Sequence, residues 1–395
     1  MSMNESLKEP FFIDDKTDNF SNRFEHVMET GRPHSNDLPV SMRKRIGEEA
    51  QRVGALLGSQ HGRRVLIIGG AGYIGGPLTT ELLRTGYKVR NVDLLIYGHQ
   101  HAMMGNLPHP DYEFQYGDLG SSDVLDRALE GVTDVIILAG LVGDPVTKKY
   151  PKESHAINDV GIRNCIDRLN GRGINKVIFV STCSNYGMIE ENVLADENFE
   201  LKPLSLYAKS KVASERHILS LKGQTDYHPT ILRFATAFGM APRMRFDLTV
   251  NEFTRELFLD KELLVYDPHT WRPYCHVKDF ARLLVRVLQF PVDEVSFEIF
   301  NSGGDANNYT KQSIVDMICA RLPDRKVSYR QDSDDPRNYK ASFEKVRSKL
   351  YFEPAYSVAD GIDEILWALR SHLLDDVESR RNYYGNYEVS YHMRS

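Results

Sequence analysis

Tyr207 and Lys211, in the stretch SLYAKSKVASE, are four residues apart and form a pair that could move a proton. Residues at this spacing are neighbours on one face of a helix. An unperturbed tyrosine has a pKa of about 10, which is too high for a base at neutral pH. A nearby ammonium favours the phenolate, so we expect Lys211 to lower the pKa of Tyr207. The pair therefore predicts a base that removes a hydroxyl proton.

Such a pair is common by chance, and its position gives it weight. It follows KVIFVSTCSNYG, which is typical of a buried strand that ends in hydroxyl side chains. Thr182 is expected at that strand end, where its hydroxyl could bind a substrate oxygen and relay a proton. Ser181 and Ser184 are the neighbouring alternatives.

The stretch VLIIGGAGYIGG predicts a strand, a glycine loop and a helix that together bind a dinucleotide. Gly69, Gly72 and Gly75 have the spacing GxxGxxG. Small residues let the backbone turn sharply and approach a pyrophosphate, whose charge lies at the N-terminus of the helix. Tyr73 and Ile74 belong to the same loop and are further candidates for cofactor binding.

Asp93 ends the next predicted strand, 18 residues beyond Gly75. A carboxylate there accepts hydrogen bonds from the ribose hydroxyls and repels a 2′-phosphate, so the predicted cofactor is NAD rather than NADP. The alternative is a glycine turn at a tight strand–helix junction without any ligand. The strand, the helix and Asp93 occur together, which argues against that alternative.

Further candidates for cofactor binding follow the third and fourth predicted strands. Asp118, before Leu119 in YGDLGS, could accept the adenine amino group or could cap a helix, and the sequence does not decide between these roles. Leu138, Ala139 and Gly140 are expected at the C-terminal edge of the sheet, where ligands bind in such folds. They leave room for the nicotinamide ribose.

Strands and helices that could position these residues alternate from Arg63 to about Gly239. The predicted strands are RVLIIG, KVRNVD, YEFQYGD, DVIILAG, KVIFVST and PTILRFAT. The predicted helices between them include Pro77–Thr85, Ser122–Leu129, Asp159–Leu169 and Tyr207–Ser220. This alternation predicts an α/β fold with a doubly wound parallel Rossmann sheet.

The alternation weakens after Gly239, which indicates a smaller C-terminal α/β substrate lobe. We expect a Rossmann domain over residues 63–240, with 275–302 interleaved, and a mainly substrate-binding lobe over 241–395. Residues 1–62 are polar at the start and then contain a possible helix, MRKRIGEEAQRVGALLG. They are interpreted as an N-terminal extension.

From about Arg63 to Leu373 the chain resembles the extended short-chain dehydrogenases/reductases, in the branch of NAD-dependent nucleotide-sugar epimerases and dehydratases. The motifs that carry the resemblance follow in order: GGAGYIG, Asp93, GDL, STCSNYG, YAKSK, LRFATAFG, WRPYCHVKDF, FNSGG and DPRNYK. The resemblance implies a doubly wound fold and a catalytic triad of Thr182, Tyr207 and Lys211. It also implies that Lys211 holds the nicotinamide ribose.

The residues after Thr182 distinguish among the activities of this family. The sugar 4,6-dehydratases carry an Asp-Glu pair there, whereas this chain has Cys183 and Ser184, and neither is a carboxylate. The resemblance therefore disfavours dehydration, and decarboxylation lacks its usual acidic neighbour. Cys183 is interpreted as a packed thiol rather than an additional proton carrier.

Anionic substrate groups need local cations, and arginine binds phosphate oxygens in bidentate fashion. The resemblance implies that Arg272 and Arg337 bind the diphosphate of a nucleotide sugar, supported by Asn251. Arg243 and Arg245, in APRMRFD, are further candidates. Each arginine could instead form a surface ion pair.

The leading prediction is an NAD-dependent nucleotide-sugar epimerase. Tyr207 would remove the C4 hydroxyl proton as hydride leaves, and the 4-keto intermediate would be reduced from the opposite face, or a neighbouring carbon would be inverted through the enol. The alternative enzymes are a 4-dehydrogenase or a 4-ketoreductase without hydride return, a subgroup that APRMRFDLTVNEF resembles. A third alternative is an NAD-binding scaffold, against which the intact triad argues.

Charge, hydropathy and cysteine spacing indicate which classes of partner are not expected. The net charge of −6 argues against a dominant surface for nucleic acid or anionic membrane. No apolar run approaches the roughly 20 residues that span a bilayer, and the first residues lack a signal-peptide core. No metal site is expected from the spacing of Cys165, Cys183, Cys275 and Cys319. We expect a cytoplasmic protein, and the resemblance implies a homodimer.

Overall fold

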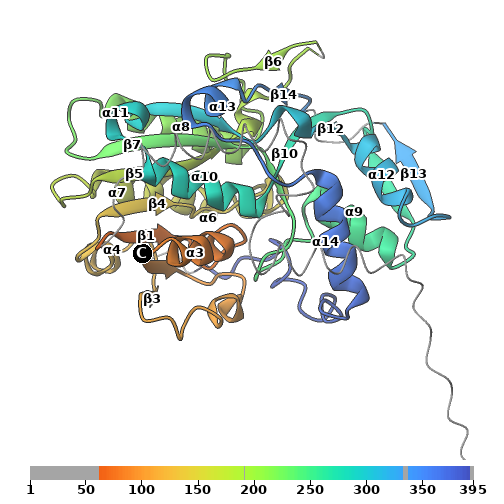
Figure 1. The fold of residues 1–395 in the computed structure, drawn as a ribbon, viewed down its shortest axis with the longest axis horizontal. Helices are drawn as coiled ribbons and strands as arrows, with labels where there is room; N and C mark the ends of the chain where they lie inside the picture. Colours follow the sequence, from red (N-terminus) through yellow and green to blue (C-terminus); the bar gives the residue numbers. More distant parts are fainter. Residues whose placement is uncertain (1–61, 191, 332–336, 392–395) are drawn as a thin grey trace, which may run out of the picture. The chain divides into compact units, whose positions relative to one another are not determined.

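A seven-stranded parallel sheet forms the centre of the computed structural model, which describes residues 62–190, 192–331 and 337–391 (Figure 1). Its strand order is β11-β7-β5-β4-β1-β2-β3. The register pairs, for example, Leu66 with Arg90 on β2 and with Val135 on β4. The strands are β1 (Arg64–Ile68), β2 (Lys88–Asp93), β3 (Tyr112–Tyr116), β4 (Asp134–Ile137), β5 (Lys176–Thr182), β7 (His228–Phe234) and β11 (Glu298–Ser302).

Helices cover both faces of this sheet, which explains why its strands read as continuous apolar runs. Val65 and Ile67 of β1 pack in one cluster with α3 (Gly75–Arg84) and α10 (Val277–Gln289). These two helices contact each other and lie in front of the sheet in Figure 1. Leu66 and Ile68 of the same strand face the opposite cluster. That cluster includes α4 (Ser122–Leu129), α7 (Ile162–Asp167) and α8 (Leu206–Ser220).

The predicted α/β fold with a doubly wound parallel sheet is confirmed. All six predicted strands are strands, and α4 has the predicted bounds. The predicted helix Asp159–Leu169 differs, because it is a π-helix, His155–Gly161, that continues into α7. Three further short helices are α5 (Asp144–Lys149), α6 (Pro151–Ser154) and α11 (Val292–Val295).

A second region packs beside the sheet's C-terminal edge around its own apolar cluster. It contains a three-stranded sheet of β12 (Asn308–Thr310), β10 (Trp271–His276) and β8 (Thr236–Phe238). A two-stranded sheet pairs β9 (Leu263–Tyr266) with β13 (Val327–Arg330). A separate two-stranded sheet, β6 (Leu194–Ala195) with β14 (Lys340–Ala341), belongs to the first cluster through Ala195 and Ala341. The helices of this region are α9 (Thr249–Phe258), α12 (Lys311–Cys319) and α14 (Val358–Arg370), whereas α13 (Glu344–Leu350) contacts β11 and belongs to the first cluster.

The proposed domain boundaries stay a prediction. Within the interleaved segment 275–302, α10 and β11 belong to the large sheet and its helices, whereas β10 belongs to the small sheet. The helix expected in the N-terminal extension lies outside the described residues. Among the residues that are described, no helix has the length and apolarity needed to cross a bilayer.

Candidate active site

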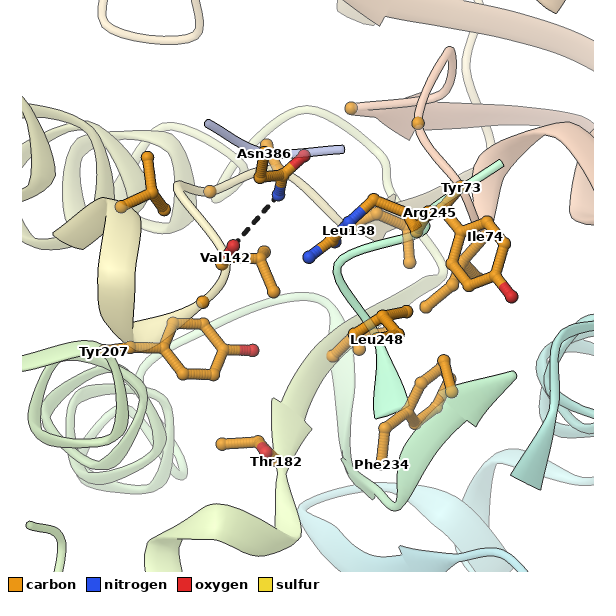
Figure 2. A pocket seen from close by; sticks show the side chains of 18 of the residues that line it. Tyr73, Ile74, Leu138, Val142, Thr182, Tyr207, Phe234, Arg245, Leu248 and Asn386 are labelled. Carbon is orange, nitrogen blue, oxygen red and sulfur yellow. Dashed lines mark hydrogen bonds between the residues drawn. The ribbon is translucent and has the colours of Figure 1, made fainter. Parts of the chain in front are cut away.

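A cavity of about 430 Å³ lies where the strands of the large sheet end (Figure 2). Four of the five predicted substrate-binding residues line it, and Asn251 does not. Every predicted cofactor-binding and catalytic residue lines it: Gly69, Gly72, Tyr73, Ile74, Gly75, Asp93, Asp118, Leu119, Leu138, Ala139, Gly140, Thr182, Tyr207 and Lys211. The structure therefore gathers residues that are spread over more than half of the chain.

The glycine loop packs tightly against its neighbours. Gly69 has a φ of +85°, and a Cβ there would lie 2.7 Å from the amide nitrogen of Ala139. A Cβ at Gly75 would collide with the Gly70 carbonyl group. Helix α3 begins at Gly75, and within the described chain no side chain caps it. Its first amide groups can therefore receive an anion, as a pyrophosphate site requires.

Asp93 carries its charge at the end of β2. Its Oδ1 accepts a hydrogen bond from the Leu95 amide at 2.8 Å, and its Oδ2 accepts one from the Ala71 amide at 3.0 Å. Burial alone would raise the pKa of this carboxyl, but His99 and the two amides outweigh it and lower the pKa. A charged carboxylate at this position suits ribose hydroxyls and disfavours a 2′-phosphate.

Asp118 is not a helix cap, so that alternative is wrong. The N-cap of α4 is Ser121. The Asp118 Oδ1 accepts a hydrogen bond from the Gly120 amide at 2.8 Å, and its Oδ2 accepts one from the Tyr391 hydroxyl at 3.1 Å. Contact with the adenine stays a prediction.

Three buried polar atoms on side chains that line the cavity indicate whether a dinucleotide fits there. Tyr97 Oη, His99 Nδ1 and Arg243 Nε have no hydrogen-bond partner among the described residues, and all three side chains line the cavity. A buried polar group without a partner is costly. Together with the glycine loop and Asp93, these atoms fit a large polar ligand such as NAD.

The candidate triad converges at the end of β5. Tyr207 lies in the first turn of α8, and Figure 2 shows its hydroxyl directed into the pocket, with Thr182 nearby. The Thr182 hydroxyl accepts a hydrogen bond from the Ser184 amide at 3.1 Å. Lys211 lies one turn further along α8, and its Nζ donates to the Val180 carbonyl at 2.7 Å. That Nζ is 5.9 Å from the centre of the Tyr207 ring.

The expectation that Lys211 lowers the pKa of Tyr207 is wrong for this arrangement. Burial raises the pKa of Tyr207, the Asp144 carboxylate adds to the rise, and Arg245 and Arg337 oppose it. Burial also lowers the pKa of Lys211 to about 8, which weakens the cation that was expected to act. The Tyr207 phenol therefore keeps its proton here, and further positive charge is required before it can act as a base.

The two alternative hydroxyls, those of Ser181 and Ser184, form hydrogen bonds with other side chains. Ser181 is buried and donates to Glu215 Oε1, and Ser184 lies 3.2 Å from the Tyr339 hydroxyl. This geometry favours Thr182 over Ser181 as the strand-end hydroxyl beside Tyr207. Cys183 is fully buried and burial raises its pKa, so its interpretation as a packed thiol is confirmed.

Arg272 and Arg337 form one arginine pair of the cavity. Arg272 Nη1 donates to the Arg337 carbonyl, and its guanidinium lies 5.2 Å from the Tyr339 ring centre. Arg337 Nη2 is 2.8 Å from Asp144 Oδ2, and its Nη1 donates to the Ser184 hydroxyl at 3.3 Å. The sequence offered no sign that Asp144, in LVGDP, would reach this pair.

Arg243 and Arg245 form a second pair, which lies close to the glycine loop. Arg245 makes a bidentate ion pair with Asp247, with both separations 2.6 Å. Its Nη2 would be 4.0 Å from a Cβ at Gly143, and its carbonyl and the Tyr73 hydroxyl both accept hydrogen bonds from Asn251. Arg243 stacks on the Tyr97 ring at 4.6 Å. Arg245 and Arg337 therefore both lie beside the loop after β4, next to Gly143 and Asp144, whereas Arg243 lies against Tyr97.

Asn251 is fully buried behind the wall. Its Oδ1 accepts from the Gly239 amide at 3.0 Å, and its Nδ2 donates to Tyr73 Oη and to the Arg245 carbonyl, both at 2.9 Å. The side chain therefore holds the loop that carries Arg245 and does not extend into the cavity. Its predicted support of a diphosphate has no direct contact in this structure.

Sequence reasoning missed Asn386 and Tyr387, which line the cavity from the C-terminal segment. Asn386 Nδ2 donates to the Val142 carbonyl at 2.9 Å, as the dashed line in Figure 2 shows. No motif marks these residues, because their place depends on contacts with segments far away in the sequence.

The model of the NAD dependent epimerase/dehydratase family matches residues 65–303, which is more than half of the chain. The chain belongs to this family. It is therefore an enzyme, and its cofactor is NAD. The family resemblance seen in the motifs is confirmed.

Known proteins match this chain over nearly their whole length. A protein of Bacillus subtilis, described as an uncharacterized UDP-glucose epimerase, is 28% identical over 76% of this chain and 95% of its own. The UDP-glucose 4-epimerase of Corynebacterium glutamicum is 26% identical over 79% of this chain and 97% of its own. The solved structure of MoeE5 in complex with UDP-glucuronic acid and NAD is 26% identical, with a TM-score of 0.67, over 78% of this chain and 99% of its own.

Proposed function

We propose that this enzyme epimerises a nucleotide-diphosphate sugar by reversible oxidation at C4. The observation that carries the proposal is one cavity that joins the glycine loop, the Thr182–Tyr207–Lys211 side chains and the Arg272–Arg337 pair. These three groups supply a dinucleotide site, a proton-transfer site and a site for a diphosphate.

Each side chain has a distinct part in the proposed reaction. NAD, when bound, would supply the reversible hydride transfer. Once Lys211 and the positive charge of bound NAD have lowered its pKa, the Tyr207 phenolate would take the C4 hydroxyl proton and later give it back, while the Thr182 hydroxyl hydrogen-bonds the same oxygen. Lys211 holds the nicotinamide ribose and contributes positive charge while it is protonated. The proposed product is inverted at C4, or at a neighbouring carbon through the enol.

The surroundings of Thr182 support epimerisation over dehydration. Cys183 is fully buried, and Ser184 is bonded to Tyr339 and Arg337. Asp144, the carboxylate that influences Tyr207, is held in an ion pair with Arg337. Neither residue after Thr182 can therefore donate and accept a proton as a carboxylate does.

The experiment incubates purified, NAD-containing protein with UDP-glucose, UDP-glucuronic acid and other nucleotide sugars. Nuclear magnetic resonance of the sugar protons should show a new stereoisomer, with no net rise in NADH absorbance. Tyr207→Phe should lower kcat by about 10²- to 10⁴-fold, because general acid–base catalysis contributes on that scale, and should retain NAD.

Tyr227→Phe is the matched control, since this tyrosine is buried in the core and its hydroxyl donates only to the Ile166 carbonyl in the part of the chain described. It should turn over like the wild type. NADH accumulating in proportion to the sugar consumed would replace the proposal with a 4-dehydrogenase. Normal turnover by Tyr207→Phe would contradict the proposed role of this residue.

A further inference from the structure

The segment after α14 returns to the cavity and is anchored beside it. Leu374, Val377 and Tyr384 are buried in a cluster with Tyr73 and Phe246. The Tyr384 carbonyl accepts a hydrogen bond from the Phe246 amide at 2.8 Å. This anchoring fixes the residues that follow, which we call the C-terminal strap, Gly385–Tyr391.

Asn386 joins the strap to two other segments of the cavity wall. Its Nδ2 donates to the Val142 carbonyl, its Oδ1 accepts from Arg243 Nη2 at 2.8 Å, and its amide donates to Asp247 Oδ2 at 3.3 Å. Arg243 Nη2 also donates to the Gly385 carbonyl at 3.1 Å. A single side chain therefore connects the loop after β4, the loop that carries the arginines, and the C-terminus.

Arg243 is a buried cation that lacks an anionic partner. Only 3% of its surface is exposed, and in the described part of the chain no carboxylate forms an ion pair with it, whereas Arg245 is neutralised by Asp247. Burial and the nearby Arg245 charge lower the pKa of Arg243 to about 10. A buried charge without a partner is strongly unfavourable. With its Nε unbonded on the cavity wall, Arg243 is suited to a bound anion.

The far end of the strap reaches the part of the cavity where the adenine is expected. The Tyr391 hydroxyl donates to Asp118 Oδ2 at 3.1 Å. Val389 and Tyr391 pack against the cluster that contains Leu119 and Ile157, both of which line the cavity. The strap thus touches the predicted dinucleotide site at two separate places.

We propose that the C-terminal strap retains the bound dinucleotide and that Asn386 is the positioning residue that holds Arg243 toward the NAD pyrophosphate. Release of NAD then requires the strap to detach. The inference uses the cofactor, NAD, and does not depend on the sugar reaction proposed above. Arg243 would serve the cofactor, while Arg272 and Arg337 would serve the substrate.

The test measures exchange of bound NAD in the full-length protein without any sugar. Protein loaded with NAD is chased with excess isotopically labelled NAD, and the released nucleotide is followed by mass spectrometry. Asn386→Ala should release NAD about 10-fold faster, because a hydrogen bond to a charged group is worth enough for a change of that size. Glu388→Gln, at an exposed strap residue whose carboxylate is 3.5 Å from Lys149, should stay within about twofold of the wild type.

The stabilisation by NAD separates a binding role from a structural one. Saturating NAD raises the Tm of protein that binds it, and this rise should shrink in Asn386→Ala. Equal falls in Tm with and without NAD, or wild-type exchange, would overturn the proposal. If Asn386→Ala fails to fold, Arg243→Met removes the cation at similar length, and unchanged NAD affinity in that variant would overturn the proposal as well.

Discussion

The floor and the outer wall of the cavity are built in different ways. The floor consists of the C-terminal ends of β1, β2, β4 and β5 and the loops that follow them. Neighbouring strands of the sheet therefore set the positions of Gly69, Asp93, Ala139 and Thr182. The wall comes from four segments that meet through long-range contacts, and the residues lining the cavity are Arg243, Arg245, Asp247, Arg272, Arg337, Tyr339, Asn386 and Tyr387.

Residues of the floor and residues of the wall are therefore held in place by different interactions. Residues on the floor inherit their geometry from a hydrogen-bonded sheet, which aligns the ends of its parallel strands. Residues on the wall are held by ion pairs and side-chain hydrogen bonds, such as Asp144 with Arg337 and Asn386 with Arg243. We therefore expect damage to the floor to cost stability, and damage to the wall to change ligand binding more selectively.

The largest effect is expected beneath the floor, at the Glu215–Arg233 ion pair. Its N–O separation is 2.8 Å, and both side chains are almost fully buried. Glu215 also accepts hydrogen bonds from Ser181 and Asn185, which flank Thr182. Glu215→Ala leaves an uncompensated buried cation and should lower the free energy of unfolding by about 3–5 kcal/mol, measured by urea denaturation.

Asp126→Ala is the matched control. Asp126 lies at the same 2.8 Å from Arg168, but that pair is exposed to solvent. Its removal should leave the unfolding midpoint nearly unchanged, because solvent screens such pairs. A Glu215→Ala protein as stable as the wild type would mean that the floor does not depend on this pair.

The same division explains what could be predicted from the sequence. The floor follows from local signals: glycines after an apolar strand, Asp93 at the next strand end, and a tyrosine and lysine one helical turn apart. Arg272 and Arg337 were found through family motifs rather than spacing. Asn386 and Asp144 were missed, because nothing near them in the chain indicates where Asn386 meets Val142 or where Asp144 meets Arg337.

The direction of the Tyr207 pKa shift could also not be predicted from the sequence. The spacing to Lys211 placed the two side chains on one helix face, as observed. The sign of the shift depends on burial and on Asp144, and neither is visible in the spacing. Electrostatic balance in a cavity is a tertiary property, so a motif can locate a catalytic pair without giving its ionisation state.

A smaller loss of stability is expected when Glu364, which lies behind the wall, is replaced. Glu364 accepts hydrogen bonds from His276 Nε2 at 2.9 Å and from the Met240 amide at 2.8 Å, and it pairs with Lys278. Burial opposes its ionisation, yet His276 and Lys278 lower the pKa of Glu364 to about 2. At neutral pH, Glu364→Gln should reduce the free energy of unfolding by up to about 3 kcal/mol.

The pH dependence has a defined sign. Because the folded pKa of Glu364 lies below its ordinary value of 4.5, its contribution is fully present above about that pH and is lost as the pH falls toward 2. Denaturation of the wild type and of Glu364→Gln should therefore converge across this acid range. Glu378→Gln is the control, because the pKa of Glu378 is also lowered to about 2 but its side chain is exposed. A difference between wild type and Glu364→Gln that persists in acid would contradict this account.

The smallest effect is expected for Arg337→Lys, which tests whether Arg337 binds the substrate rather than the cofactor. Lysine keeps the charge but loses the planar fork that binds a diphosphate, so KM for the nucleotide sugar should rise about 10-fold with little change in kcat. NAD exchange should be unchanged, whereas Asn386→Ala should show the opposite pattern. Arg347→Lys, on an exposed helix, is the control and should alter neither quantity. Faster NAD release from Arg337→Lys would place Arg337 with the cofactor, and Arg243 and Arg337 would then no longer serve separate ligands.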